Sequence, residues 1–324
     1  MKSIHAILAA VAVTTTAALL SCNALAEDIN FGIISTDSSS VLKQRWDPLI
    51  TDMEHATGLT VHAYFATDYS GVIEGMRFNK VQLAWYGNKS AIEAVDRSDG
   101  EVFAQVVYAD GTAGYKSLLI TNVNSPYKTL DDVLKNGKNI NFGIGDPEST
   151  SGTLVPSYYI FAQNHINPQT FFKTVRSSNH ESNLLATINN QVDVATNNTE
   201  MLDKLKIDHP DKAQQVRVLW TSPLIPSDPL VWRKDLPEAT KAKLRDFFLN
   251  YGNTPHGRDV LMSIYKWGGF RASTDAQLDP VRQLSLFQTK LKLQGDEHMD
   301  PDQKKAQIAQ IDAQLAVLQK SSAQ

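Results

Sequence analysis

The feature that most constrains the fold is a strand, a polar turn and a helix in succession near the middle of the chain. Residues 140–144 alternate apolar and polar side chains, as a half-buried strand does. From Leu154 to Ile166, apolar residues recur at helical spacing. Between them lies Gly-Asp-Pro-Glu-Ser-Thr-Ser-Gly, residues 145–152. The turn therefore joins a strand to a helix that begins near residues 149–151.

The chemistry of this turn suits an oxyanion. A helix N-terminus has up to four unpaired backbone N–H groups and the positive end of the helix dipole. Ser149, Thr150 and Ser151 add three hydroxyl donors, and Gly145 and Gly152 allow close backbone approach. The turn thus predicts a site for phosphate, phosphonate or sulfate. The alternative is an N-cap followed by polar surface, because Ser and Thr are preferred caps.

Strand and helix patterns alternate along most of the chain, which predicts an α/β fold with doubly wound parallel sheets. The pattern runs twice. Polar clusters follow the expected strands in both halves, at residues 35–40, 86–90, 146–151 and 197–200. Ligands of open α/β sheets bind at these strand ends. We therefore expect two lobes that face each other across a cleft and close on a ligand by hinge motion.

Length, composition and net charge limit the classes of partner that the chain can bind. The 324 residues, 42% of them hydrophobic, are enough for two domains. The formal net charge of −4 argues against nucleic acid and against an anionic membrane surface as partners. An anionic ligand must then be held by local donors rather than by a basic field.

Residues 1–26 are typical of a secretory signal peptide. Lys2 precedes an apolar run, and Ala24-Leu25-Ala26 forms a small-residue cleavage site. The only cysteine, Cys22, lies in this segment, so the exported chain has neither a disulfide nor a thiol nucleophile. Residues 19–22, Leu-Leu-Ser-Cys, also resemble a lipobox, so a lipid anchor on Cys22 is the alternative to cleavage after Ala26.

Three motifs together carry a family resemblance: residues 145–152, the Ala-Thr-Asn-Asn-Thr-Glu of residues 195–200, and the Leu-Ile-Pro-Ser-Asp-Pro of residues 224–229. With them, about residues 29–290 resemble the periplasmic phosphonate-binding proteins of bacterial ABC importers. The resemblance implies a two-lobed periplasmic binding protein of type II (Venus-flytrap). Lobe 1 is expected at residues 27–120 plus 222–324, and lobe 2 at residues 121–221.

The resemblance also implies the site. It assigns the phosphonate group to Ser149, Thr150 and Ser151, and a neighbouring position to His180. It assigns two closing tyrosines and two carboxylates that face the amino group of the ligand: Tyr69, Tyr115, Glu200 and Asp228. Asn179, before His180, stands where the family pattern has Gly. Each of these residues also has an ordinary structural reading, as packing, cap, helix-start acid or turn residue.

The two ends of this site fit a zwitterion. Neutral donors and a helix dipole suit a phosphonate head, and two carboxylates suit an ammonium tail. The expected ligand is 2-aminoethylphosphonate, delivered to a membrane permease. The alternative is a receptor for phosphate, phosphite or an organosulfonate. A bare inorganic anion would leave Glu200 and Asp228 without a cationic partner.

We expect no enzyme, no metal and no cofactor. The chain has no Gly-x-Ser-x-Gly elbow, and its eight histidines include no His-Glu-x-x-His motif. Near the C-terminus, an apolar seam recurs at spacings of three, four and three: Ile308, Ile311, Leu315 and Leu318. This seam predicts either packing onto the parent lobe or pairing of two chains into a homodimer.

Overall fold

The computed structural model of the chain describes residues 28–296 and 298–321. The predicted signal peptide, residues 1–26, and its Cys22 lie outside the described residues. Within the described part, none of the helices combines the length and the apolar character that a membrane span needs.

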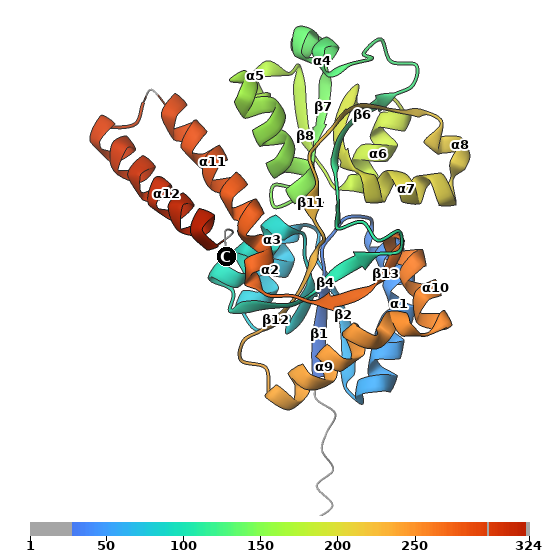
Figure 1. Cartoon of the computed structure of the whole chain (residues 1–324). Helices are drawn as coiled ribbons and strands as arrows, with labels where there is room; N and C mark the ends of the chain where they lie inside the picture. The colour runs from blue at the N-terminus through green and yellow to red at the C-terminus, as the bar shows by residue number, and fades with distance from the viewer. Residues whose placement is uncertain (1–27, 297, 322–324) are drawn as a thin grey trace, which may run out of the picture.

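The first sheet has six strands in the order β13-β4-β12-β3-β1-β2 (Figure 1). Their bounds are β1 Asp28–Ile33, β2 Thr60–Phe65, β3 Leu83–Trp85, β4 Gly100–Tyr108, β12 Pro229–Arg233 and β13 Trp267–Ala272. Strands β2, β1 and β3 are parallel, whereas β12 and β13 run antiparallel to their neighbours. The sheet is therefore mixed, and the expectation of a wholly parallel sheet was wrong. The physical reason is that β12 enters between β3 and β4 from the opposite direction, after the chain returns from the second sheet.

Five longer helices cover this sheet: α1 Ser39–Thr57, α2 Tyr69–Arg77, α3 Asn88–Arg97, α9 Glu238–Asn250 and α10 Pro255–Tyr265. The shorter η5 Tyr251–Asn253 and η6 Asp275–Leu278 flank α10 and the last helices. Three buried tryptophans, Trp46, Trp85 and Trp267, form the centre of the core, with ring centroids 5.3 to 5.6 Å apart. Buried aromatic pairs of this kind stabilise a core beyond the area that they bury.

The second sheet has five strands in the order β10-β6-β9-β7-β8. Their bounds are β6 Ser117–Asn122, β7 Asn141–Ile144, β8 Thr174–Ser177, β9 Val194–Asn198 and β10 Val216–Thr221. The helices around it are α4 Leu130–Asn136, η1 Gly137–Asn139, η2 Thr150–Leu154, η3 Ser157–Phe161, η4 Ala162–Asn164, α5 Pro168–Phe171, α6 His180–Ile188, α7 Thr199–Asp208 and α8 Pro210–Ala213. A separate aromatic cluster of Phe142, Phe161 and Phe172 fills part of its core.

The chain passes between the two sheets through a pair of short strands, β5 Gly114–Tyr115 and β11 Ile225–Pro226. Figure 1 shows β11 running from one sheet toward the other. Two sheets, each with its own helices and joined by paired crossover strands, form the predicted two-lobed α/β architecture. The lobe boundaries at residues 120/121 and 221/222 stay a prediction; β6 already begins at Ser117.

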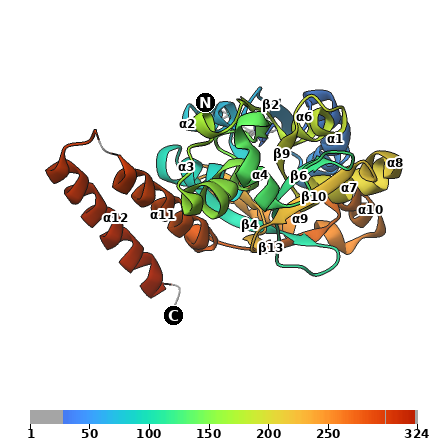
Figure 2. The same cartoon turned by 90° about the horizontal axis from the view of Figure 1, so that it is seen from above.

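The last two helices, α11 Asp279–Gly295 and α12 Pro301–Ser321, form a hairpin that projects from the body of the molecule (Figures 1 and 2). The apolar seam of α12 faces α11: Ile311 and Leu315 are buried, and the outer Val317 is exposed. An ion pair between Lys290 and Asp312 links the two helices at 2.5 Å. The seam therefore packs within the chain, against α11.

Candidate ligand-binding site

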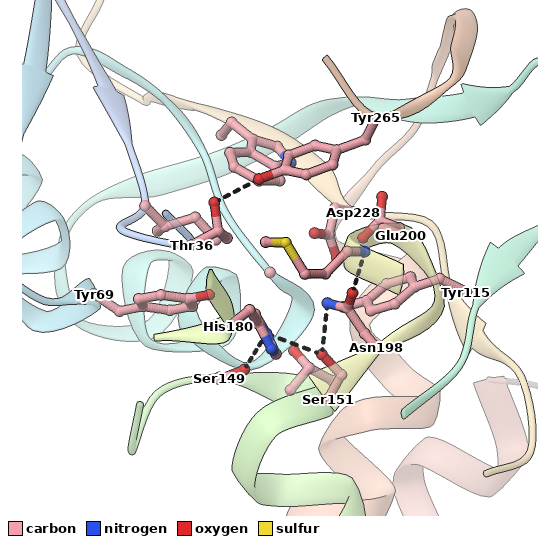
Figure 3. A pocket seen from close by; sticks show the side chains of 15 residues that line it. Thr36, Tyr69, Tyr115, Ser149, Ser151, His180, Asn198, Glu200, Asp228 and Tyr265 are labelled. Carbon is pink, nitrogen blue, oxygen red and sulfur yellow. Dashed lines mark hydrogen bonds between the residues drawn. The ribbon is translucent and has the colours of Figure 1, made fainter. Parts of the chain in front are cut away.

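A small polar cavity lies between the lobes. All of the predicted site residues line it: Tyr69, Tyr115, Ser149, Thr150, Ser151, His180, Glu200 and Asp228. They come from α2, β5, the turn after β7 with the start of η2, α6, α7 and the residue just before β12 (Figure 3). The structure thus brings together residues that are up to 159 positions apart in the sequence (228 − 69). Their contacts with a ligand stay a prediction.

The polar turn forms the floor of this cavity. β7 ends at Ile144, and Ser149 is the N-cap of the following helix: its Oγ accepts a hydrogen bond from the Gly152 N–H at 2.9 Å. The hydroxyl hydrogen of Ser149 is not used by this cap. Gly145 and Gly152 pack against each other so closely that a Cβ on Gly145 would lie 2.5 Å from the Gly152 Cα. The two glycines therefore fold the turn back on itself.

The helix after the turn starts where the sequence predicts, but it is wound more widely than an α-helix. It begins at Thr150, within the predicted start at residues 149–151, but it is wound as a π-helix over Thr150–Leu154 and Ser157–Phe161. Single π-turns are often found at functional sites. Thr150 and Ser151 are almost fully buried at its start. Their side chains line the cavity beside Ser149.

His180 lies next to these hydroxyls at the start of α6. Its Nε2 is 3.3 Å from Ser149 Oγ and 3.4 Å from Ser151 Oγ. Burial lowers the pKa of His180 to about 4, so the imidazole is neutral at pH 7. The preceding Asn179 has φ −73° and caps α6 through its side chain, so this position does not require glycine. His180 reaches the turn with Asn179 in place.

Two carboxylates occupy another side of the cavity. Glu200 Oε1 accepts hydrogen bonds from Tyr108 OH at 2.8 Å and from Trp267 Nε1 at 3.4 Å. Burial raises the pKa of Glu200 to about 7. Burial and the neighbouring Glu200 charge raise the pKa of Asp228 well above 3.8, against an opposing hydrogen bond from Tyr115. Two acids that are largely removed from water and repel each other favour a cation beside them.

The two lobes are in contact on both sides of the cavity. On one side, Lys89 Nζ is 3.0 Å from Glu148 Oε2, and the Lys89 N–H donates to Thr150 Oγ1 at 2.8 Å. On the other side, the Ser38 N–H donates to Glu181 Oε2 at 2.7 Å. These contacts connect the first lobe with the turn and with α6 of the second lobe. The conformation is therefore closed.

The sequence did not predict every lining residue individually. The additional ones are Ile34, Thr36, Trp85, Gly87, Asn198, Met201 and Tyr265. Thr36, Gly87 and Asn198 belong to the polar clusters expected at strand ends, which was the signal for them. Tyr265 ends α10, and no local pattern marked it, because only the tertiary fold brings α10 to the cavity.

Two α/β lobes closed over a buried polar cavity define a two-lobed solute-binding protein. The chain also matches the family described as "ABC transporter, phosphonate, periplasmic substrate-binding protein" over residues 31–278. The chain belongs to this family. It is thus a periplasmic phosphonate-binding component of an ABC importer.

Individual relatives agree with this assignment. The "Phosphonates-binding periplasmic protein" of Escherichia coli K12 is 54% identical over 287 residues, which is 89% of this chain and 84% of that protein. The crystal structure of a binding-protein component of an ABC phosphonate transporter from Pseudomonas aeruginosa is similar with a TM-score of 0.89 and 51% identity, and the match covers 92% of this chain and 98% of that one. A "Phosphate-import protein PhnD" of Mycolicibacterium smegmatis is 30% identical, over 79% of this chain and 84% of that protein.

Proposed function

We propose that the cavity selects 2-aminoalkylphosphonates, with 2-aminoethylphosphonate as the preferred ligand. The observation that carries this proposal is the presence of two carboxylates, the half-buried Glu200 and the buried Asp228, in the same small cavity as the hydroxyl-rich helix start. One end offers donors for an anion, and the other end offers acceptors for a cation. A zwitterion of this length satisfies both.

The head of the ligand binds at residues 149–151. Three hydroxyl groups and the N-terminus of the following helix supply hydrogen bonds and a positive potential, and the surrounding protein lowers the local dielectric. Thr150 Oγ1 accepts from the Lys89 N–H, so its own hydrogen can donate to a phosphonate oxygen. An anion at this position also favours the imidazolium form of His180, which adds a charge-assisted hydrogen bond.

The ammonium tail binds beside Glu200 and Asp228. Tyr108 and Trp267 hold one oxygen of Glu200, which fixes the direction of the carboxylate. A cation there lowers the cost of burying two acids and strengthens its own hydrogen bonds. A ligand without an ammonium group leaves this repulsion in place. Selectivity for aminated phosphonates follows.

The mechanism is capture rather than chemistry. A ligand that contacts both lobes binds the closed form more tightly than the open form, and this difference drives closure. The closed form then delivers the ligand to the membrane permease of the importer. Ser149 caps a helix, and its hydroxyl donates to the ligand, with His180 Nε2 3.3 Å away as a second partner of the same anion.

The second candidate function is a receptor for a simpler oxyanion. It is favoured by the Mycolicibacterium relative, whose name says that it imports phosphate. The turn at residues 149–151 suits inorganic phosphate and an organic phosphonate equally well. Glu200 and Asp228 separate the two candidates, because they would repel an anion that lacks a cationic tail.

Titration calorimetry of the exported chain with three ligands tests the proposal. We expect 2-aminoethylphosphonate to bind at least about tenfold more tightly than methylphosphonate or inorganic phosphate, since one charge-assisted hydrogen bond contributes about 1.5–3 kcal/mol. Equal affinity for all three ligands would favour the oxyanion receptor and remove the ammonium site.

Pairing of two chains through the C-terminal helices stays a prediction. The seam at Ile311 and Leu315 already packs against α11 of the same chain. A homodimer built on the hairpin would therefore use its outer surface or exchange α12 between chains. The lipid anchor on Cys22 likewise stays an alternative to cleavage after Ala26.

A further inference from the structure

Asp37 is a buried carboxylate that does not line the cavity itself but bonds to two side chains that do, Thr36 and Tyr265. It follows Thr36 just after β1, and it is 2% exposed. Its Oδ1 lies 3.0 Å from Nη1 of Arg45 in α1. Burial raises the pKa of Asp37, and the Arg45 guanidinium opposes this shift. The ion pair favours the ionised carboxylate.

The other oxygen of Asp37 accepts from two hydroxyl groups that line the cavity. Thr36 Oγ1 donates to Asp37 Oδ2 at 2.9 Å, and Tyr265 OH donates to the same oxygen. The two hydroxyl oxygens are themselves 2.8 Å apart, a contact drawn in Figure 3. Arg45 also lies over the Tyr265 ring, 5.3 Å from its centroid. The carboxylate and the two hydroxyls thus form a triangle held by Arg45.

The number of hydrogens in this triangle determines whether its hydroxyl groups can donate to a ligand or only accept from it. A hydroxyl has one hydrogen and two lone pairs, whereas an ionised carboxylate only accepts. The hydrogens of Thr36 and Tyr265 both lie inside the triangle, directed to Asp37 or to each other. What the two hydroxyls present to the cavity is therefore lone pairs.

Thr36 and Tyr265 form one wall of the cavity, and its hydrogen-bonding character is the opposite of that of the turn at residues 149–151. In Figure 3, Thr36 and Tyr265 lie on the far side of the cavity from Ser149 and Ser151. The turn supplies hydrogen-bond donors, and the wall supplies acceptors. A phosphonate oxygen at the wall would meet only lone pairs, whereas an ammonium group there would find partners for its hydrogens.

We propose that Asp37 is a positioning residue that makes Thr36 and Tyr265 an acceptor-only wall, which orients an aminoalkylphosphonate with its ammonium group away from the turn. This inference rests on the proposed function, because it concerns how the same cavity recognises the same ligand. Asp37 acts through the two hydroxyls and does not contact the ligand. Its effect is to discriminate between ligand groups that donate and ligand groups that only accept.

The test is the Asp37→Asn variant, titrated by calorimetry with 2-aminoethylphosphonate and with methylphosphonate. Arg45 only donates, so it holds the amide oxygen of the variant and leaves the amide NH2 to face the two hydroxyls; at least one hydroxyl then accepts from it and turns its hydrogen into the cavity. We expect the affinity for 2-aminoethylphosphonate to fall about tenfold and that for methylphosphonate to stay within about twofold. Arg45→Lys is the matched control: it alters the same ion pair but keeps a cation beside Asp37, so the carboxylate stays ionised and the ratio of the two affinities should not change.

A second pair of variants keeps the test decisive if Asp37→Asn does not fold. Thr36→Val and Tyr265→Phe remove the acceptors and leave the Asp37–Arg45 pair in place, and they should cause the same selective loss. Equal losses for both ligands, or no loss, would overturn the role of Asp37. A wild-type protein that does not distinguish the two ligands would instead overturn the proposed function.

Discussion

At the scale of single residues, Glu200 and Asp228 are the cavity side chains whose negative charges cost the most free energy to keep away from water. Asp228 is buried and Glu200 is half-buried, and the pKa of each is raised because removal from water disfavours the charged form. Glu200 therefore holds a proton over part of the neutral pH range. An ammonium group favours the ionised form, so ligand binding and proton release are linked.

This linkage predicts a pH dependence with a definite sign. As pH rises from about 5.5 to about 7.5, Glu200 loses its proton, and the affinity for 2-aminoethylphosphonate should increase about tenfold or more. Below this range, the carboxyl is neutral and the attraction is lost. Calorimetry across the range measures the slope.

Glu200→Gln is the control for this slope. The amide keeps the shape of the side chain but does not titrate, so most of the pH dependence should disappear. The titration of the phosphonate group and of His180 affects both proteins alike. An identical slope in wild type and Glu200→Gln would show that Glu200 is not the linked group.

The site residues could be predicted to different extents for physical reasons. Ser149, Thr150 and Ser151 are consecutive, so their shared position at a helix start can be recognised from local sequence. Asp37 and Tyr265 are more than 200 residues apart and meet only through the packing of α1 and α10. Local sequence carries no signal for a contact of that kind.

At the scale of elements, α3 connects the first lobe to the polar turn at residues 145–152. The Lys89 N–H, in the first turn of α3, donates to Thr150, and the Lys89 side chain pairs with Glu148. Both contacts cross between the lobes, and both are available only when the lobes are closed. They stabilise the closed form whichever ligand is bound.

Lys89→Met should therefore lower the affinity for every ligand by the same factor. The partly buried ion pair contributes about 1 kcal/mol, so we expect an affinity loss of about fivefold for 2-aminoethylphosphonate and for methylphosphonate. Lys43→Met, which removes the exposed Lys43–Asp47 pair on α1, is the matched control and should change neither. Loss of affinity for only one ligand would place Lys89 in ligand recognition instead of closure.

Where helices and strands are regular, local periodicity in the sequence predicted them well. The strand at residues 140–144 and the helix start beside Ser149 were predicted and are confirmed. The π-helical winding from Thr150 was not predicted, because it widens the turn without changing the apolar pattern. The direction of β12 was missed because strand polarity depends on the path of the whole chain.

At the scale of the whole molecule, the hairpin of α11 and α12 stands apart from the ligand cavity. α12 packs mainly on α11, whereas α11 also contacts α3 and the helix after the turn. Removal of α12 should leave both lobes and the hinge strands intact. The hairpin is thus separable from ligand capture.

Truncation before Pro301 tests this separation. We expect the shortened chain to bind 2-aminoethylphosphonate within about twofold of the full chain, because α12 contributes no residue to the cavity. Size exclusion of the two proteins also tests the predicted homodimer. A full chain that elutes as a dimer and a truncated chain that elutes as a monomer would support pairing through the hairpin.

The two-lobed architecture was predictable because the strand–helix pattern repeats on both sides of the chain centre. Polar residues at strand ends in both halves further indicated a cleft between them. The lobe boundaries were harder, since β6 continues directly from the crossover strand β5 with no linker of distinct composition.

In the proposed function, one cavity binds both the phosphonate group and the ammonium group of an aminoalkylphosphonate. A crystal structure of the exported chain with 2-aminoethylphosphonate tests it most directly. We predict phosphonate oxygens within hydrogen-bond distance of Ser149, Thr150 and Ser151, and the ammonium nitrogen between Glu200 and Asp228. A ligand bound in the reverse direction, or an ammonium group that contacts neither carboxylate, would contradict the claim.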